Sequence, residues 1–164
     1  MTNRYTCVKC GKIVEEKNMC VVDNDHICLN CMYQGHEPIE VFPIGFVRNK
    51  QTRGENFGLE GKEDISKIEL FDSQKSFMYK LEDEKRLMII YQVHKPRKVV
   101  SVFKRGMDGK EVGVFASRTP DRLSRLAVKT VELVDVQGTT LFVKELDAIN
   151  GSPVLDIKVQ LEGY

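Results

Sequence analysis

Four of the five cysteines fall into two Cys-x-x-Cys pairs near the start of the 164-residue sequence. The pairs are Cys7 with Cys10 and Cys28 with Cys31, and 17 residues separate them. Zinc takes four ligands in a tetrahedron, and each Cys-x-x-Cys turn brings two thiolates to one ion without strain. We therefore predict a bound Zn²⁺. All four positions are filled by protein, which indicates a structural ion, because a catalytic zinc keeps one position open for water.

Cys20 and His26 are the alternative ligands, and a mixed site that uses either of them stays open. The simpler interpretation of Cys20 is a small buried residue between Met19 and Val21. A redox dithiol is a weaker alternative, because a single redox motif does not need a second Cys-x-x-Cys pair. Paired metal ligands rather than a disulfide framework indicate a reducing compartment, so we expect a cytoplasmic protein.

A second stretch with chemical potential is EVGVFASRTPDRLSRLAV, residues 111–128. Its first half alternates as a strand does, and it then runs into a polar and cationic corner that contains Ser117, Arg118 and Pro120. Proline cannot continue a strand ladder, so the strand should end here. Exposed amides, a hydroxyl and a guanidinium can together hold a carboxylate or phosphate. A capped loop with an ordinary salt bridge is the alternative interpretation.

The basic residues are unevenly distributed. Residues 92–129 contain ten Lys or Arg against three acidic residues, a surplus of +7 in a chain whose net charge is +1. The overall charge neither requires nor excludes a nucleic-acid partner, but this segment is a candidate positive patch. A solvated charged face is the alternative, because such faces are common on soluble proteins.

The elements that would position these residues are mostly strands. Residues 1–38 hold all the cysteines, and we predict a zinc-knuckle module there, of treble-clef or ribbon type. From residue 39 the pattern becomes β-rich, and residues 39–164 form the second predicted domain. Strands are expected at ISKIELF and at LMIIYQVHK, the latter a central strand. A short amphipathic helix is expected at SQKSFMYKLEDEKR, with Phe77, Met78 and Leu81 on one side.

Three turn dipeptides divide the rest of the chain, at Asp108-Gly109, Gln137-Gly138 and Asn150-Gly151. Such dipeptides supply the positive φ that tight hairpins require. Closely spaced antiparallel strands predict a β-barrel with few short helices. The sequence contains no Rossmann fingerprint or P-loop, and no apolar run long enough to span a membrane, so we expect no membrane association.

Two strings in the second half resemble a known family. VGVFASRTPDR and LDAINGSPVLDIK are similar to motifs of the TsaA/TrmO-like β-barrel tRNA methyltransferases, and PIGFVRN and VHK match at the expected places. The resemblance covers residues 43 to 158. It implies an antiparallel barrel that binds S-adenosylmethionine, acts as a homodimer and methylates N6 of threonylcarbamoyl-adenosine beside the tRNA anticodon.

The resemblance also implies the site residues. The cofactor would be held by Phe115, Ala116, Ser117, Arg118, Asp147 and Asp156. His94 and Asp147 are the implied catalytic residues. Each assignment has an alternative: Asp147 can be a turn cap, Asp156 a strand residue bonded to a neighbouring loop, and His94 a side chain with an ordinary hydrogen bond. The predicted tRNA contacts are Lys95, Arg97, Lys98, Lys104, Arg105, Arg122 and Arg125.

The chain also departs from the family pattern. After Arg122 the family continues Pro-Asn-Pro-Ile-Gly, whereas residues 123–127 are LSRLA, and Asn150 replaces the second Asp of the other motif. These changes leave two alternatives to methyl transfer. One is a protein that binds S-adenosylmethionine or RNA without catalysis, and the other is a zinc-dependent interaction module.

Overall fold

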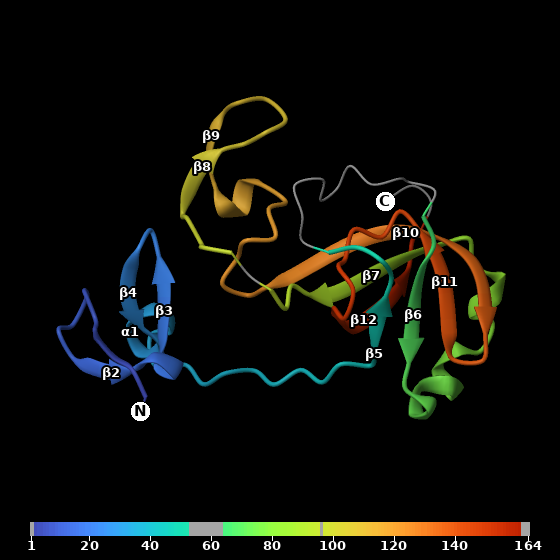
Figure 1. Ribbon diagram of the computed structural model, residues 1–164, viewed down its shortest axis with the longest axis horizontal. Helices are drawn as coiled ribbons and strands as arrows, with labels where there is room; N and C mark the ends of the chain where they lie inside the picture. The colour runs from blue at the N-terminus through green and yellow to red at the C-terminus, as the bar shows by residue number, and fades with distance from the viewer. Residues whose placement is uncertain (1, 53–63, 96, 162–164) are drawn as a thin grey trace. The chain divides into compact units, whose positions relative to one another are not determined.

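The computed structural model describes residues 2–52, 64–95 and 97–161, and Figure 1 shows their elements. Two compact units form. Unit 1 joins Met1–Glu40 to Lys95–Arg125, and unit 2 joins Val41–His94 to Leu126–Tyr164. The division at residues 38 and 39 stays a prediction, and unit 1 also recruits a segment from the middle of the chain. The sequence also predicts a loop at NKQTRGENFGLEGKED, residues 49–64, which interrupts the β-rich region and lies largely outside the described residues.

Unit 1 is built from three small hairpins. They are β1 (Arg4–Thr6) with β2 (Ile13–Glu15), β3 (Met19–Val22) with β4 (Asp25–Cys28), and β8 (Val102–Lys104) with β9 (Glu111–Gly113). Its helices are η1 (Glu16–Asn18), α1 (Leu29–Tyr33) and η4 (Val114–Ala116). The predicted strand through Ala116 was therefore too long, because the chain turns into η4 after Gly113.

The tip of the β3–β4 hairpin holds the Lys95–Arg125 segment in unit 1. Val22 forms a parallel bridge with Val99, and the Asp23 amide donates a hydrogen bond to the Val99 carbonyl over 3.1 Å. The Asp23 carboxylate accepts hydrogen bonds from the Ser101 amide (2.8 Å) and hydroxyl (2.5 Å), and these lower the pKa of Asp23. Segments far apart in sequence are thus fixed together by directional bonds.

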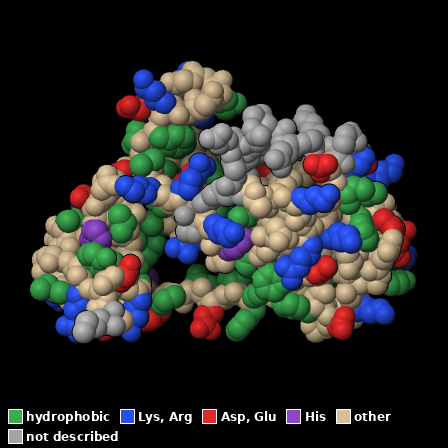
Figure 2. Space-filling model, in the orientation of Figure 1, with side chains coloured by type: hydrophobic (Ala, Val, Ile, Leu, Met, Phe, Trp, Pro, Cys, Tyr) green, Lys and Arg blue, Asp and Glu red, His purple; other side chains and the backbone are tan. Residues whose placement is uncertain are grey.

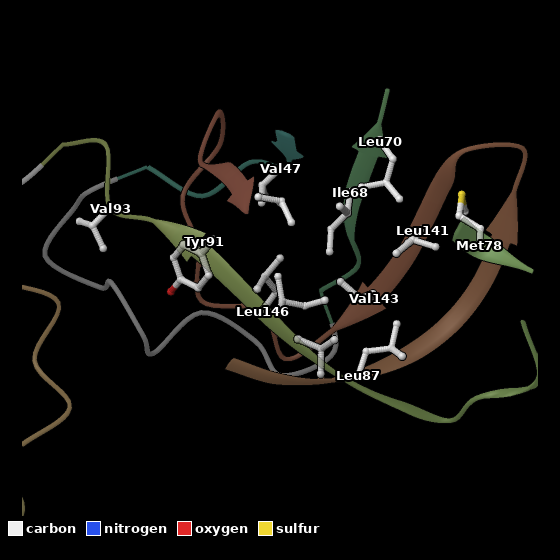
Figure 3. Packing of buried hydrophobic residues seen from close by; sticks show 14 residues of the cluster. Val47, Ile68, Leu70, Met78, Leu87, Tyr91, Val93, Leu141, Val143 and Leu146 are labelled. Atoms are coloured by element: carbon white, nitrogen blue, oxygen red, sulfur yellow. The ribbon is translucent and has the colours of Figure 1, made fainter. Parts of the chain in front are cut away.

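Unit 2 is a closed antiparallel barrel, as the sequence predicted. Its strands follow the order β10, β11, β6, β5, β12, β7, and β7 pairs again with β10. The strands are β5 (Gly45–Arg48), β6 (Ser66–Leu70), β7 (Arg86–Gln92), β10 (Leu126–Gln137), β11 (Thr140–Lys144) and β12 (Pro153–Val159). The barrel fills its interior with side chains from every strand, and Figure 3 shows part of this cluster, with Tyr91 toward one end and Met78 toward the other.

The expected amphipathic helix is present as two short 3₁₀ helices, η2 (Asp72–Met78) and η3 (Leu81–Asp83). Met78 is buried and Leu81 packs against the barrel core, as predicted, whereas Phe77 is exposed. The 3₁₀ geometry explains the error, because three residues per turn place different side chains on one face than an α-helix does.

Close strand packing requires a glycine at one position of the barrel. A Cβ at Gly45 would lie 2.3 Å from the Glu69 carbonyl oxygen on β6, which no real side chain tolerates. Gly45 is also the glycine of the PIGFVRN string.

In the described part of the chain, no helix is long and apolar enough to cross a membrane.

Candidate functional site

The four predicted cysteine ligands form one cluster. Their Sγ atoms all lie within 4.8 Å of one another, and the Sγ atoms of Cys10 and Cys28 are 3.9 Å apart. Cys7 and Cys10 flank the knuckle turn after β1, whereas Cys28 ends β4 and Cys31 lies in α1. A tetrahedron with Zn–S bonds of about 2.3 Å places neighbouring sulfurs about 3.8 Å apart. The cluster therefore fits a zinc ion.

The electrostatics of the cluster also suit a cation. The Cys7 thiol accepts hydrogen bonds from the Cys28 amide (3.3 Å) and the Lys9 amide (3.4 Å), and the Cys28 amide is the main reason that the pKa of Cys7 falls to about 6. The pKa of Cys31 is raised, chiefly by hydrogen bonds with the thiols of Cys28 and Cys10. Four thiols this close cannot all ionise without a positive charge among them, and a metal ion supplies it.

Cys20 and His26 do not join the cluster. The Cys20 thiol donates to the Ile27 carbonyl over 3.3 Å, and partial burial raises its pKa. The His26 ring stacks on Tyr5 with the centroids 4.3 Å apart. The group that could hold a metal ion is thus the predicted set of four cysteines.

The polar corner after β9 is a loop tied down by Arg122. Its guanidinium donates to the carbonyls of Val114 (3.0 Å), Thr119 (2.9 Å) and Ser117. The Ser117 hydroxyl also donates to the Val114 carbonyl, over 2.7 Å. Arg122 was predicted to contact RNA, and in the structure these bonds hold the loop that carries the predicted cofactor residues.

Two side chains of this loop point outward. Phe115 is 96% exposed, and Arg118 is exposed and forms no ion pair with any residue that the structure describes. Both are therefore available for a ligand. An unpaired guanidinium suits a carboxylate or phosphate, and an exposed aromatic ring suits a flat apolar group.

Asp147 follows β11 in the barrel and has a defined partner. The buried Tyr91 hydroxyl donates to its carboxylate over 2.8 Å, and Lys129 Nζ lies 3.9 Å from the other oxygen. Burial, and secondarily the Asp147 charge, raises the pKa of Tyr91, so the hydroxyl remains a donor. The Asp147 side chain is still 41% exposed and can accept a bond from a ligand.

His94 lies after β7 in the same unit as Asp147. Its Nδ1 is 3.4 Å from the Ser152 hydroxyl, which donates to the Ile149 carbonyl over 2.8 Å. Residues 146–152 therefore contain one predicted catalytic residue, Asp147, and contact the other, His94, through Ser152.

Asn49 organises this segment, and sequence reasoning missed it. Its amide nitrogen donates to the Ala148 carbonyl (2.9 Å) and to the Ser66 hydroxyl (3.0 Å). Its backbone amide donates to the Asn150 side chain over 3.2 Å. The available signal was its place at the end of the PIGFVRN string.

Asp156 has its own neighbours. Its carboxylate pairs with Lys158 (2.8 Å) and accepts the Ile157 amide (2.9 Å), next to an irregularity in the register of β12 with β7. It is half exposed.

The remaining predicted RNA contacts differ in whether their charged groups already form ion pairs or hydrogen bonds within the protein. Arg105 pairs with Asp108 (2.6 Å) and donates to the Ala116 carbonyl, and Arg97 pairs with Asp121 (3.3 Å). Lys98 donates to the Asn24 side chain over 3.1 Å. Lys95, Lys104 and Arg125 are exposed, and no ion pair joins them to the described residues. All of these cations belong to unit 1.

The predicted site residues therefore divide between the two units. Residues 115–118 and the basic side chains belong to unit 1, whereas His94, Asp147 and Asp156 belong to unit 2.

The family model described as the tRNA-methyltransferase O N-terminal domain matches residues 56–164. The chain belongs to this family. The predicted resemblance is confirmed, and the cysteine cluster lies outside the matched residues.

Relatives are named both for binding and for catalysis. The chain is similar to an S-adenosyl-L-methionine-binding protein of Archaeoglobus fulgidus, with 32% identity over 71% of this chain and 85% of the relative. A probable S-adenosyl-L-methionine-binding protein of Methanothermobacter thermautotrophicus is 33% identical over 76% of this chain and 91% of its own. The tRNA (adenine(37)-N6)-methyltransferase of Homo sapiens is 28% identical over 58% of this chain and 22% of its own.

Solved structures support the fold. TrmO from Pseudomonas aeruginosa aligns with a TM-score of 0.60 and 23% identity over 76% of this chain. The alignment spans 57% of the solved chain, so this chain covers little more than half of it.

Proposed function

We propose that this protein binds S-adenosylmethionine and transfers its methyl group to RNA, specifically to N6 of threonylcarbamoyl-adenosine in a tRNA anticodon loop. The observation that carries the proposal is membership of the tRNA-methyltransferase O family across residues 56–164. Relatives named as S-adenosyl-L-methionine-binding proteins and as tRNA (adenine(37)-N6)-methyltransferases support the cofactor and the acceptor.

The proposed cofactor residues have the chemistry that such a molecule needs. When bound, S-adenosylmethionine supplies an electrophilic methyl group on a sulfonium. The free guanidinium of Arg118 suits the carboxylate of its methionine tail, and the exposed ring of Phe115 suits its adenine. Ala116 and Ser117 contribute the loop backbone beside them, and Asp156 is a further candidate for a hydroxyl or ammonium group.

Asp147 and His94 are the candidates for moving a proton. N6 of the acceptor must lose one proton when it gains the methyl group, and a carboxylate or a neutral imidazole can accept it. The Tyr91 hydroxyl fixes one oxygen of Asp147 over 2.8 Å, and the Asp147 side chain as a whole is still 41% exposed. Methyl transfer depends mainly on alignment, so positioning should supply much of the rate.

The proposed partners are tRNA and a second copy of the chain. An anticodon loop presents its bases unpaired, so they can be bound without opening a duplex. The basic residues of the Lys95–Arg125 segment would hold the phosphates, and this part of the affinity should fall as salt rises. We also propose zinc as the ion of the cysteine cluster, with a structural role.

The first test is calorimetric titration of S-adenosylmethionine into the zinc-loaded protein. Arg118→Ala should weaken binding tenfold or more, about 1.4 kcal/mol. Arg4→Ala is the matched control, because Arg4 is an exposed arginine of the same unit in β1. Equal affinities for all three proteins would remove Arg118 from the cofactor site.

The second test is methyl transfer from labelled S-adenosylmethionine to tRNA that carries threonylcarbamoyl-adenosine without the methyl group. Incorporation that Arg118→Ala abolishes would support the proposal. A protein that neither binds the cofactor nor methylates this RNA would refute it.

A second candidate function is S-adenosylmethionine or RNA binding without methyl transfer. It is favoured by residues 123–127, which replace the family's Pro-Asn-Pro-Ile-Gly, and by relatives whose names state binding alone. Cofactor binding without methylation of any cellular RNA would support this alternative. A zinc-dependent interaction module is the third candidate, and partner capture that survives deletion of residues 1–38 would exclude it.

A further inference from the structure

A groove of about 570 Å³ lies within unit 1, between the cysteine module and the Lys95–Arg125 segment. Both walls belong to one compact unit, and the bonds from Asp23 to Val99 and Ser101 hold them together. The volume suits one or two nucleotides, since small-molecule sites span roughly 300 to 1,000 Å³. The groove wall that the cysteine module supplies lies outside residues 56–164, the part of the chain that the family model matches.

The charges around the groove favour an anion. Arg97, Lys98, Arg122 and Arg125 line it, whereas Glu16 is the acidic residue among its lining. Asp121 neutralises Arg97 in part, but no carboxylate of the described residues pairs with the other three cations. In Figure 2 basic side chains gather where the Lys95–Arg125 segment runs above the β3–β4 hairpin.

The opposite wall supplies aromatic rings. Tyr5 and His26 stack with an interplanar angle of 16°, and this pair lines the groove together with Tyr33. Flat rings beside clustered cations are the combination by which proteins bind single-stranded nucleic acids, with bases stacked on the rings and phosphates on the cations.

We propose that this groove binds a short single-stranded segment of RNA, with a base against the Tyr5–His26 pair and phosphates against Arg97, Lys98 and Arg125. This inference rests on the proposed function in one respect, which is that the ligand is RNA. It gives the cysteine module a direct role in RNA binding, which the family match to residues 56–164 does not supply.

The test uses the full, zinc-loaded chain without S-adenosylmethionine, so that failure of methyl transfer does not affect it. The probe is a fluorescein-labelled six-nucleotide oligoadenylate RNA, and binding is read by anisotropy. The groove variant is Arg97→Gln with Arg125→Asn. Asn is chosen because Arg125 has a φ of 54°, a left-handed conformation that Asn tolerates better than most residues.

The matched control is Lys9→Gln with Lys12→Gln, which removes the same charge from two exposed lysines of the same unit that lie outside both the groove and the Lys95–Arg125 segment. The groove variant should weaken binding at least tenfold and reduce the slope of log K against log salt by about 1.4, since each phosphate contact to a single strand contributes about 0.7. The control should lose much less. Equal losses in the two variants, or no binding by the unaltered protein, would overturn the proposal.

A second variant tests the base contact. Tyr5→Leu should weaken oligoadenylate binding at least about fivefold but leave an abasic ribose-phosphate oligomer of equal length nearly unaffected, because stacking requires the base. Zinc stoichiometry and circular dichroism check that the module is still folded. An equal effect on both oligomers, or displacement of the RNA by hexaglutamate peptide at the same concentration, would contradict binding of RNA bases.

Discussion

At the scale of single residues, the Tyr91–Asp147 hydrogen bond links the barrel core to the candidate site. Tyr91→Phe removes the hydroxyl that donates to Asp147 over 2.8 Å and keeps the ring in the core. We expect the free energy of unfolding to fall by about 1 kcal/mol, the usual value of one such bond. Urea unfolding followed by circular dichroism measures this, because the chain contains no Trp.

Tyr79→Phe is the control for this prediction, since Tyr79 is 83% exposed in the same unit. Equal stability of the two variants would mean that the Tyr91–Asp147 bond contributes nothing to folding. Because the pKa of Tyr91 is raised, its hydroxyl remains protonated near neutral pH. The loss of unfolding free energy in Tyr91→Phe should therefore be the same at pH 6 and at pH 8.

Residue types were predictable here, but their roles were only partly so. The sequence identified the four cysteines because metal ligation requires a recognisable spacing. It assigned Arg118 to the cofactor and Arg122 to RNA, but it did not show that Arg118 is exposed whereas the Arg122 guanidinium donates to three loop carbonyls. That difference depends on where the backbone carbonyls point once the loop has formed, which charge and spacing do not encode.

At the scale of elements, β5 and β6 lie so close together that the stability of the barrel should depend on Gly45. Gly45→Ala would place a Cβ 2.3 Å from the Glu69 carbonyl oxygen, so the two strands must separate. We expect a loss of about 1–3 kcal/mol or more, as for overpacked cores, in urea unfolding of the barrel.

Gly113→Ala in β9 is the matched control, because its added Cβ meets nothing closer than the Ser101 carbonyl oxygen at 3.8 Å. That variant should unfold at nearly the same urea concentration as the unaltered protein. A Gly45→Ala protein of unchanged stability would show that β5 can shift away from β6 at little cost.

The strands of the barrel could be located from the sequence, and the extent of some other elements could not. The apolar run at β7 predicted a central strand, and β7 does pair with both β10 and β12. The alternation before Ala116 predicted a longer strand than β9, which pairs with β8 only as far as Gly113. Three alternating residues fit a strand or a 3₁₀ turn equally well, and the bond from the Ser117 hydroxyl to the Val114 carbonyl favours the turn.

At the scale of the whole molecule, unit 1 is assembled from two distant segments, which no local pattern in the sequence reveals. The cysteine pairs predicted a module that ends near residue 38, but Lys95–Arg125 packs with it. The joining contacts include the bridge between Val22 and Val99 and the hydrogen bonds of Asp23 with Ser101 and of Lys98 with Asn24. Such contacts depend on the β3–β4 hairpin that the cysteines hold in place.

This dependence gives the last prediction, which concerns Cys28→Ser. Loss of one ligand should release the metal and unfold the cysteine module, because binding and folding are coupled in small metal sites. Since Cys28 ends β4, the hairpin tip at Asp23 should then release Ser101, and amides of the Lys95–Arg125 segment should exchange faster with solvent. The barrel amides should keep their protection, because the core cluster of the barrel contains no cysteine.

Cys20→Ser is the control for this prediction. Cys20 lies outside the cysteine cluster, so this variant should leave the metal content unchanged. Hydrogen exchange and metal analysis of Cys28→Ser test both expectations. A variant that keeps stoichiometric zinc would contradict the four-cysteine site. A variant that loses zinc while the Lys95–Arg125 amides stay protected would show that this segment folds independently of the module.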